Sequence, residues 1–82
     1  MSKHGYHITN IPKGILGERD KIQEEYLEWL DACKQDCIIM ELVELSDLLG
    51  AIDHYVKKYN LTLDDLIKMR DITTRAFENG RR

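Results

Sequence analysis

Hydrophobic and polar positions follow a helical period over most of this chain, but not over its first residues. Residues 1–17 carry isoleucines at irregular spacing, together with the only proline and three of the five glycines. We therefore predict an extended N-terminal arm over 1–17 and a helical domain over 18–82. The predicted fold class is all-α, a three-helix chain with an extended N-terminal arm.

The helical period predicts three helices, over about 19–32, 38–58 and 63–78. Residues 33–37 form the expected turn between the first two helices, and so short a turn makes them antiparallel. Asn60 suits the left-handed conformation that ends many helices. Thr62 is a suitable N-cap for the third helix, because acidic residues occupy the first turn behind it.

The second predicted helix is apolar over most of its circumference, which is typical of a helix at the centre of its assembly. Its expected inward face comprises Ile38, Leu42, Leu45, Leu48, Leu49, Ile52, Tyr55, Val56 and Tyr59. The inward face of the first helix comprises Ile22, Tyr26, Trp29, Leu30 and Cys33. The inward face of the third comprises Leu63, Leu66, Ile67 and Phe77. Three helices cannot enclose the second one, so we predict that two chains pair into a helical bundle.

Charge divides the chain into three parts, although the formal net charge is only −3. Residues 22–56 carry nine acids and one base, whereas both ends of the chain are net positive. A centre this acidic repels phosphates, so we expect no direct nucleic-acid binding. The chain has no apolar run of transmembrane length and no secretory signal, so we expect no membrane contact and a cytoplasmic location.

Two pairs of acids stand three residues apart on consecutive helices, and residues at this spacing are neighbours on a helix surface. Glu25 and Glu28 form the first pair, and Glu44 and Asp47 form the second. Because the helices are antiparallel, the pairs can face each other and bind a hard cation such as Mg²⁺. On spacing alone a solvated acidic face fits equally well. The acids have few basic partners at i+4 and several border apolar positions, which favours the metal site.

The segments EEYLEWLDA (24–32) and ELSDLL (44–49) resemble the MazG-type nucleoside triphosphate pyrophosphohydrolases, which belong to the all-α NTP pyrophosphatase group. The family signature is E-x-x-E, a spacer, then E-x-x-D. The resemblance implies that Glu25, Glu28, Glu44 and Asp47 are metal ligands and catalytic residues. It implies Mg²⁺-dependent cleavage, with Mn²⁺ as a substitute, of a nucleoside triphosphate to a monophosphate and pyrophosphate. It also implies a homo-oligomer, either a dimer or a dimer of dimers.

The rest of the predicted site is less closely tied to the signature. Lys68, Arg70 and Arg75 are expected to meet the distal phosphates, and Trp29 or Tyr55 the base, although core packing also explains these aromatic residues. One of the four metal-ligating carboxylates, or else Glu24 or Glu41 next to them, would accept the proton of the attacking water.

Three further expectations complete the sequence reading. Glu24 and Asp31 should point away from the apolar face of their helix. The C-terminal segment resembles short MazG-like proteins encoded by bacteriophages, which implies a bacterial or phage-infected host cell. The alternative function is a non-catalytic nucleotide- or partner-binding helical module that retains the acidic metal site.

Overall fold

The computed structural model describes residues 7–78 and Gly80, without the side chains of residues 76 and 77. The described chain is all-helical and contains no strand, as the sequence predicts. Its elements are α1 (Arg19–Lys34), α2 (Ile38–Val56), the 3₁₀ turn η1 (Lys57–Tyr59) and α3 (Leu63–Glu78). Among the described residues, no helix combines the length and apolar character that a membrane crossing requires.

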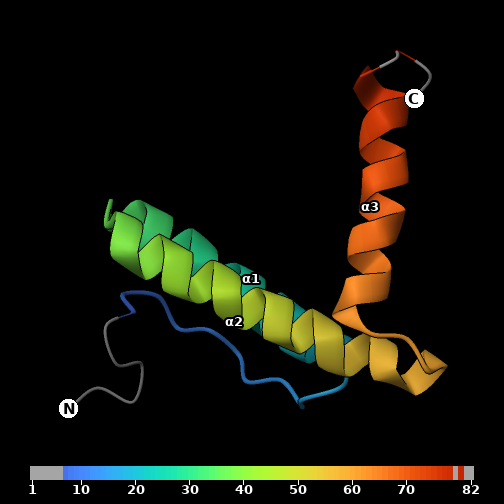
Figure 1. Cartoon of the computed structure of the whole chain (residues 1–82). Coiled ribbons are helices and arrows are strands. Elements are labelled where there is room, and N and C mark those ends of the chain that lie inside the picture. Colours follow the sequence, from blue (N-terminus) through green and yellow to red (C-terminus); the bar gives the residue numbers. More distant parts are fainter. Residues whose placement is uncertain (1–6, 79, 81–82) are drawn as a thin grey trace.

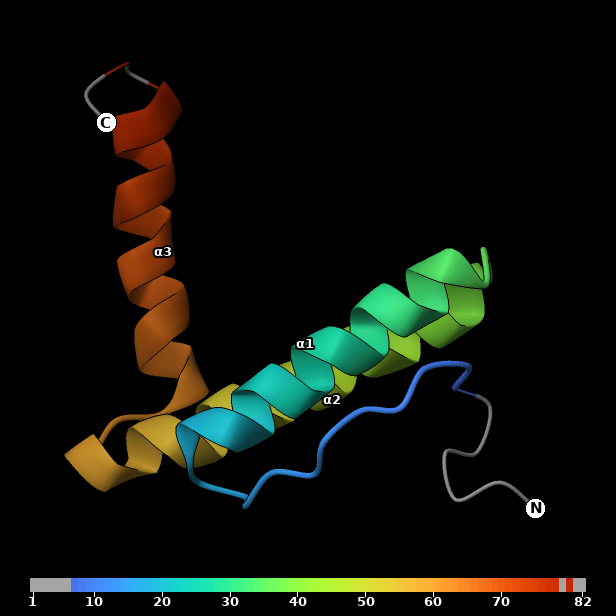
Figure 2. The ribbon, with the colours of Figure 1, turned by 180° about the vertical axis from the view of Figure 1, so that it is seen from behind.

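α1 and α2 form an antiparallel hairpin that lies side by side over its whole length (Figures 1 and 2). α1 ends two residues later than predicted, because the amide of Gln35 still donates to the carbonyls of Asp31 and Ala32. Asp36 makes the turn with a φ of 54°. Aspartate tolerates this left-handed conformation better than most residues, which explains a tight turn without glycine.

The start of α3 has the helix-boundary features that the sequence predicts at Asn60 and Thr62. Asn60 adopts the left-handed conformation with a φ of 60°. The Thr62 hydroxyl accepts a hydrogen bond from the Asp65 amide at 3.2 Å, and the Asp65 carboxylate accepts one from the Thr62 amide at 2.8 Å. These reciprocal bonds form a capping box. The Leu63 amide also donates to Asp53 Oδ1 at 2.9 Å, which attaches the first turn of α3 to α2.

Beyond this attachment α3 leaves the hairpin and projects away from it (Figure 1). Little apolar side-chain surface is therefore buried within one chain. The buried hydrophobic residues of the described chain are Ala32, Ala51 and Val56. The expected inward face of α2 is instead largely exposed, with Leu42 58% and Leu49 50% accessible. Phe77, predicted to face inward, has a side chain outside the described part of the structure.

Residues 7–18 contain neither helix nor strand and run along the hairpin (Figure 2). Gly14 lies where this segment passes closest to the start of α1. A Cβ atom at Gly14 would collide with the backbone of Asp20 and Lys21, so the path requires a glycine here. The segment is thereby held against the acidic side of α1.

Candidate metal centre

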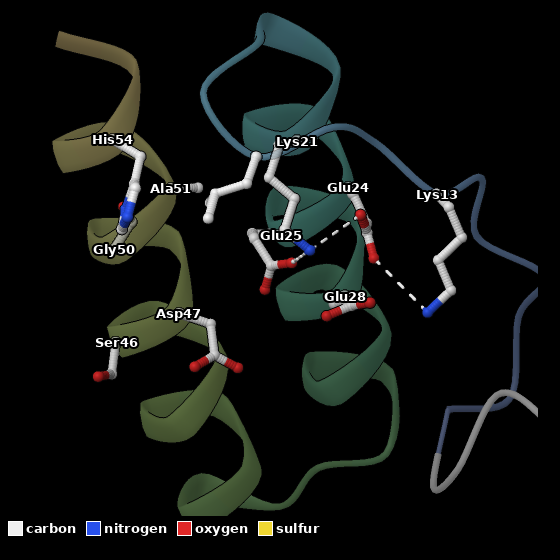
Figure 3. A pocket seen from close by; sticks show the side chains of 11 residues that line it. Lys13, Lys21, Glu24, Glu25, Glu28, Ser46, Asp47, Gly50, Ala51 and His54 are labelled. Carbon is white, nitrogen blue, oxygen red and sulfur yellow. Dashed lines mark hydrogen bonds and ion pairs between the residues drawn. The ribbon is translucent and has the colours of Figure 1, made fainter. Parts of the chain in front are cut away.

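The structure brings the two predicted acidic pairs together between α1 and α2. One carboxylate oxygen from each of Glu25, Glu44 and Asp47 lies within 4.8 Å of the others. Glu28 forms a similar group with Glu24 and Glu25. The α1 and α2 acids point toward each other across the gap between the helices (Figure 3). Such convergence of oxygen donors suits a hard divalent cation.

These acids differ in their access to solvent. Glu44 is 1% exposed and Glu25 is 4% exposed, whereas Asp47 is exposed at the rim. A cavity of about 470 Å³ opens beside them and is lined by Glu25 and Asp47 but not by Glu44. Its lining residues are Lys13, Leu16, Lys21, Glu24, Glu25, Glu28, Ser46, Asp47, Gly50, Ala51 and His54. An ion or a phosphate group can therefore reach the carboxylates from the Asp47 side.

Lys21 is the main basic partner of the acids, and the sequence analysis overlooked it. Its Nζ lies 3.1 Å from Glu24 Oε1 and 3.0 Å from Glu25 Oε2. Burial alone would lower the Lys21 pKa, but the hydrogen bonds to Glu25 and Glu24 outweigh it and raise that pKa. The signal was available, because Lys21 precedes Glu24 by three residues and Glu25 by four.

By its helical position Glu24 lies opposite the apolar face of α1, as the sequence predicts, but the segment before α1 covers it there. It is 3% exposed, and its Oε1 accepts a hydrogen bond from the Gly14 amide at 2.8 Å. Lys13 Nζ lies 4.0 Å from Oε2. Burial would raise the Glu24 pKa, but the Gly14 amide and Lys21 together lower it. Glu24 therefore stays ionised beside the centre, in the position expected for a residue that assists the metal ligands.

Glu28 has the most perturbed acidity of the centre. Burial, followed by the charges of Glu25, Glu44 and Glu24, raises its pKa to about 8. Burial and the charges of Glu44 and Glu25 also raise the pKa of Asp47. These shifts show that the carboxylates repel each other when all are ionised. A divalent cation would remove the repulsion and hold every ligand in its charged form.

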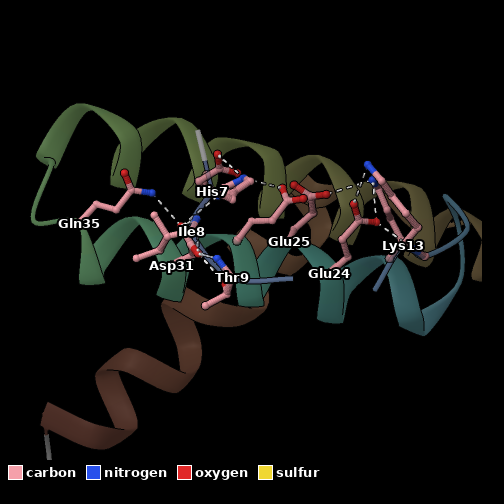
Figure 4. Close-up of polar contacts among 12 residues, drawn as sticks. His7, Ile8, Thr9, Lys13, Glu24, Glu25, Asp31 and Gln35 are labelled. Carbon is pink, nitrogen blue, oxygen red and sulfur yellow. Dashed lines mark hydrogen bonds and ion pairs between the residues drawn. The ribbon is translucent and has the colours of Figure 1, made fainter. Parts of the chain in front are cut away.

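Asp31 also lies opposite the apolar face of α1 and is likewise covered by the segment before α1, with 1% of its surface exposed. Its carboxylate accepts hydrogen bonds from the amides of Ile8 and Thr9, from the Thr9 hydroxyl, and from Gln35 Nε2 at 2.8 Å (Figure 4). Burial would raise the Asp31 pKa, but these hydrogen bonds, led by that of the Thr9 hydroxyl, lower it. Asp31 thus anchors the segment before α1 to the helix.

His7 enters the same cluster from that segment. Its Nδ1 lies 3.3 Å from Asp31 Oδ1, and its Nε2 lies 3.7 Å from Glu28 Oε1 and 3.6 Å from Glu44 Oε2. The ring sits between the two helices (Figure 4). No motif in the sequence places His7 there, because its neighbours in the structure are more than twenty positions away.

Two other predicted site residues lie away from the cavity. Glu41 is positioned next to Cys33, whose thiol pKa is raised by burial and then by the Glu41 carboxylate. Trp29 packs against Tyr26, with ring centroids 6.0 Å apart, and does not line the cavity. Tyr55 lines a separate cavity with Tyr59, where α1 begins and α2 ends.

The three predicted phosphate-binding residues lie on α3, which projects from the hairpin (Figure 1). Lys68 pairs with Asp64 at 3.5 Å, and Arg70 pairs with Asp71 at 2.7 Å. Arg75 is exposed. Within one chain, none of the three lines the cavity over the acids. The described basic residues that do line it are Lys13 and Lys21.

Comparisons with known proteins give no relative for this chain. No protein-family model, curated protein or solved structure matches it.

Proposed function

We propose that this chain is a Mg²⁺-dependent nucleoside triphosphate pyrophosphohydrolase, which converts ribo- or deoxyribonucleoside triphosphates to monophosphates and pyrophosphate. The observation that carries the proposal is the convergence of Glu25, Glu44 and Asp47 within 4.8 Å, beside an open cavity that Glu25 and Asp47 line. The E-x-x-E and E-x-x-D resemblance supplies the reaction class. Mn²⁺ is expected to substitute for Mg²⁺, since both ions take carboxylate ligands.

The donor set fits such an ion. Glu25, Glu28, Glu44 and Asp47 would hold it, and all four donate carboxylate oxygens, the ligand type that Mg²⁺ prefers. Bound there, Mg²⁺ supplies charge neutralisation for the phosphates and acidifies a bound water. The raised pKa values of Glu28 and Asp47 support the site, because they indicate a local excess of negative charge.

The chain's own residues would handle the proton and the phosphates. Glu24 touches the centre and stays ionised, so we assign the water's proton to Glu24 rather than to Glu41, which lies beside Cys33. Lys13 Nζ is solvent-exposed at the rim and can meet a phosphate oxygen. Lys68, Arg70 and Arg75 can serve the same purpose only if α3 of a second chain brings them to the cavity.

A homo-oligomer, either a dimer or a dimer of dimers, is part of the proposal. The outward face of α2 presents a continuous set of exposed apolar residues: Ile38, Ile39, Leu42, Val43, Leu45 and Leu49. α3 adds Ile67, Met69 and Ile72. A single chain leaves this much apolar surface in water only at considerable cost, and pairing two copies of α2 would bury it.

Pyrophosphate release provides the direct test. Purified protein is incubated with each of the common ribo- and deoxyribonucleoside triphosphates and Mg²⁺, and at least one should yield pyrophosphate. Glu44→Gln should abolish release while circular dichroism shows unchanged helical content. Asp36→Asn, in the exposed α1–α2 turn, removes an equal charge elsewhere and should retain activity. Activity in Glu44→Gln would exclude Glu44 from the site, and Mg²⁺ binding without pyrophosphate release would favour a non-catalytic nucleotide- or partner-binding module.

A further inference from the structure

We infer that His7, Glu28 and Glu44 form a second cation site, which takes a borderline transition ion such as Zn²⁺ or Co²⁺ through one imidazole nitrogen and two carboxylates. One donor atom from each residue lies within 4.8 Å of the other two. The site shares Glu28 and Glu44 with the proposed magnesium centre, but it requires no pyrophosphohydrolase activity. It joins the segment before α1 to both helices of the hairpin.

The donor spacing is that of ligands around an ion. His7 Nε2 lies 3.7 Å from Glu28 Oε1 and 3.6 Å from Glu44 Oε2. Both separations exceed the roughly 2.7–3.2 Å of a direct N–H···O hydrogen bond. Tetrahedral ligands held about 2.1 Å from Zn²⁺ stand about 3.4 Å apart. The three donors therefore need only small movements to coordinate a common ion.

Asp31 provides evidence that is independent of the acidic cluster itself. Its Oδ1 lies 3.3 Å from His7 Nδ1, which leaves Nε2 directed at the two glutamates. Histidine ligands of metals usually donate their other ring N–H to a carboxylate in this way. Asp31 is itself fixed by Gln35 and by the amides of Ile8 and Thr9, so the imidazole is oriented by a rigid neighbour (Figure 4).

The chemistry of the donors separates this site from the magnesium centre. Imidazole nitrogen suits Zn²⁺, Cu²⁺, Fe²⁺ and Ni²⁺, whereas Mg²⁺ prefers oxygen ligands and retains water. Glu25, Glu44 and Asp47 offer only oxygen, and His7 adds nitrogen only at the Asp31 side. The chain would therefore have two adjacent ion-binding positions that prefer different ions, and Glu44 belongs to both.

The test uses the full chain carrying Cys33→Ser and Cys37→Ser, so that no thiolate competes for the ion. Histidine side chains are labelled with ¹⁵N, and Zn²⁺ is added without nucleotide. One equivalent should shift the Nε2 resonance of His7, and excess Mg²⁺ should not reproduce the shift. By calorimetry, His7→Gln should lower Zn²⁺ affinity at least about 100-fold, and Asp31→Asn about 10–100-fold. The matched controls His4→Gln and His54→Gln should leave that affinity unchanged.

Three results would overturn the inference: no shift at His7 Nε2 with saturating Zn²⁺, a shift at Nδ1 instead, or unchanged affinity in His7→Gln. The first of these would indicate that His7 contacts the surrounding carboxylates without serving as an ion ligand. Pyrophosphate release with Mg²⁺ is measured separately, so the proposed function and the zinc site can fail independently of each other.

Discussion

The two long sides of the α1–α2 hairpin differ in polarity, and they reverse the usual arrangement in helical proteins, in which apolar side chains are buried and charged side chains are exposed. On the side covered by residues 7–18, carboxylates are buried, and Glu44 and Asp31 are the largest fully buried side chains of the described chain. On the outward side of α2, leucines and isoleucines lie in water. The difference indicates that the acidic side is completed by the chain's own amides and lysines, whereas the described residues of one chain leave the apolar side uncovered.

Placing charge on the apolar outward face of α2 should have the largest effect of the changes considered. Leu42 and Leu49 stand two helical turns apart on the outward face of α2, and each leucine contributes about 1.5–3 kcal/mol when fully buried. Changing both to glutamate should raise the dimer dissociation constant at least about 100-fold, as measured by sedimentation velocity. Gln23→Glu with Lys34→Glu, at exposed positions of α1, is the control. A wild-type monomer at micromolar concentration would contradict the proposed oligomer.

Removing the Asp31 carboxylate should have the next largest effect, because it destabilises the buried acidic side of the hairpin. Asp31→Ala leaves the amides of Ile8 and Thr9 and the Gln35 side chain without their acceptor. We expect the free energy of unfolding to fall by about 3 kcal/mol, with faster amide hydrogen exchange at Ile8 and Thr9. Asp64→Ala removes an exposed carboxylate that pairs with Lys68, and should change stability by less than about 0.5 kcal/mol. Equal effects in the two variants would show that Asp31 does not hold the segment.

The two glycines on the acidic side offer a sharper contrast. Gly14→Ala places a Cβ against the backbone of Asp20 and Lys21, and should reduce the free energy of unfolding by about 1–3 kcal/mol. Gly50, within α2, has open space around its Cβ position, so Gly50→Ala should raise that free energy by about 0.5–1 kcal/mol. Thermal or chemical denaturation measures both. If both substitutions changed the free energy of unfolding in the same direction, the close approach at Gly14 would be refuted.

The pH dependence of stability should give the most specific signal. Because the folded pKa of Glu28 is about 8, above the ordinary 4.5, the folded chain binds more protons than the unfolded chain between these values. The stabilisation from protonated Glu28 is therefore complete below about pH 4.5 and is lost as the pH rises through 8. Millimolar Mg²⁺ should flatten this loss in a series of thermal melts. Asp31 acts oppositely, since its lowered pKa gives stability that disappears in acid.

Most of the helical architecture was predictable from local signals. The apolar period located all three helices, and Asn60 and Thr62 marked the boundary between α2 and α3. The pairing of Glu25 with Glu44 and Asp47 also followed, because the i, i+3 spacing and a short turn set which faces meet. These signals depend on nearest neighbours in a helix, which a sequence displays directly.

The remainder depends on contacts that local patterns do not encode. Glu24 and Asp31 occupy the polar side of α1 by periodicity, and only the passage of residues 7–14 over that side buries them. Backbone amides supply much of this contact, and an amide has the same chemistry at every position. The exposure of Leu42 and Leu49 was also not predictable, because the period shows that a face is apolar but not which chain covers it.

The way in which residues 7–14 are held has a consequence for how this segment tolerates sequence change. Three of its contacts with α1 are made by main-chain N–H groups, those of Ile8, Thr9 and Gly14. The side chain of Ile8 can therefore vary without loss of its contact, whereas the Thr9 hydroxyl also donates to Asp31 and Gly14 has no room for a Cβ atom. Carboxylates on α1 accept all three of these bonds, so a saturation scan should find Ile8 permissive and Glu24 and Asp31 restrictive.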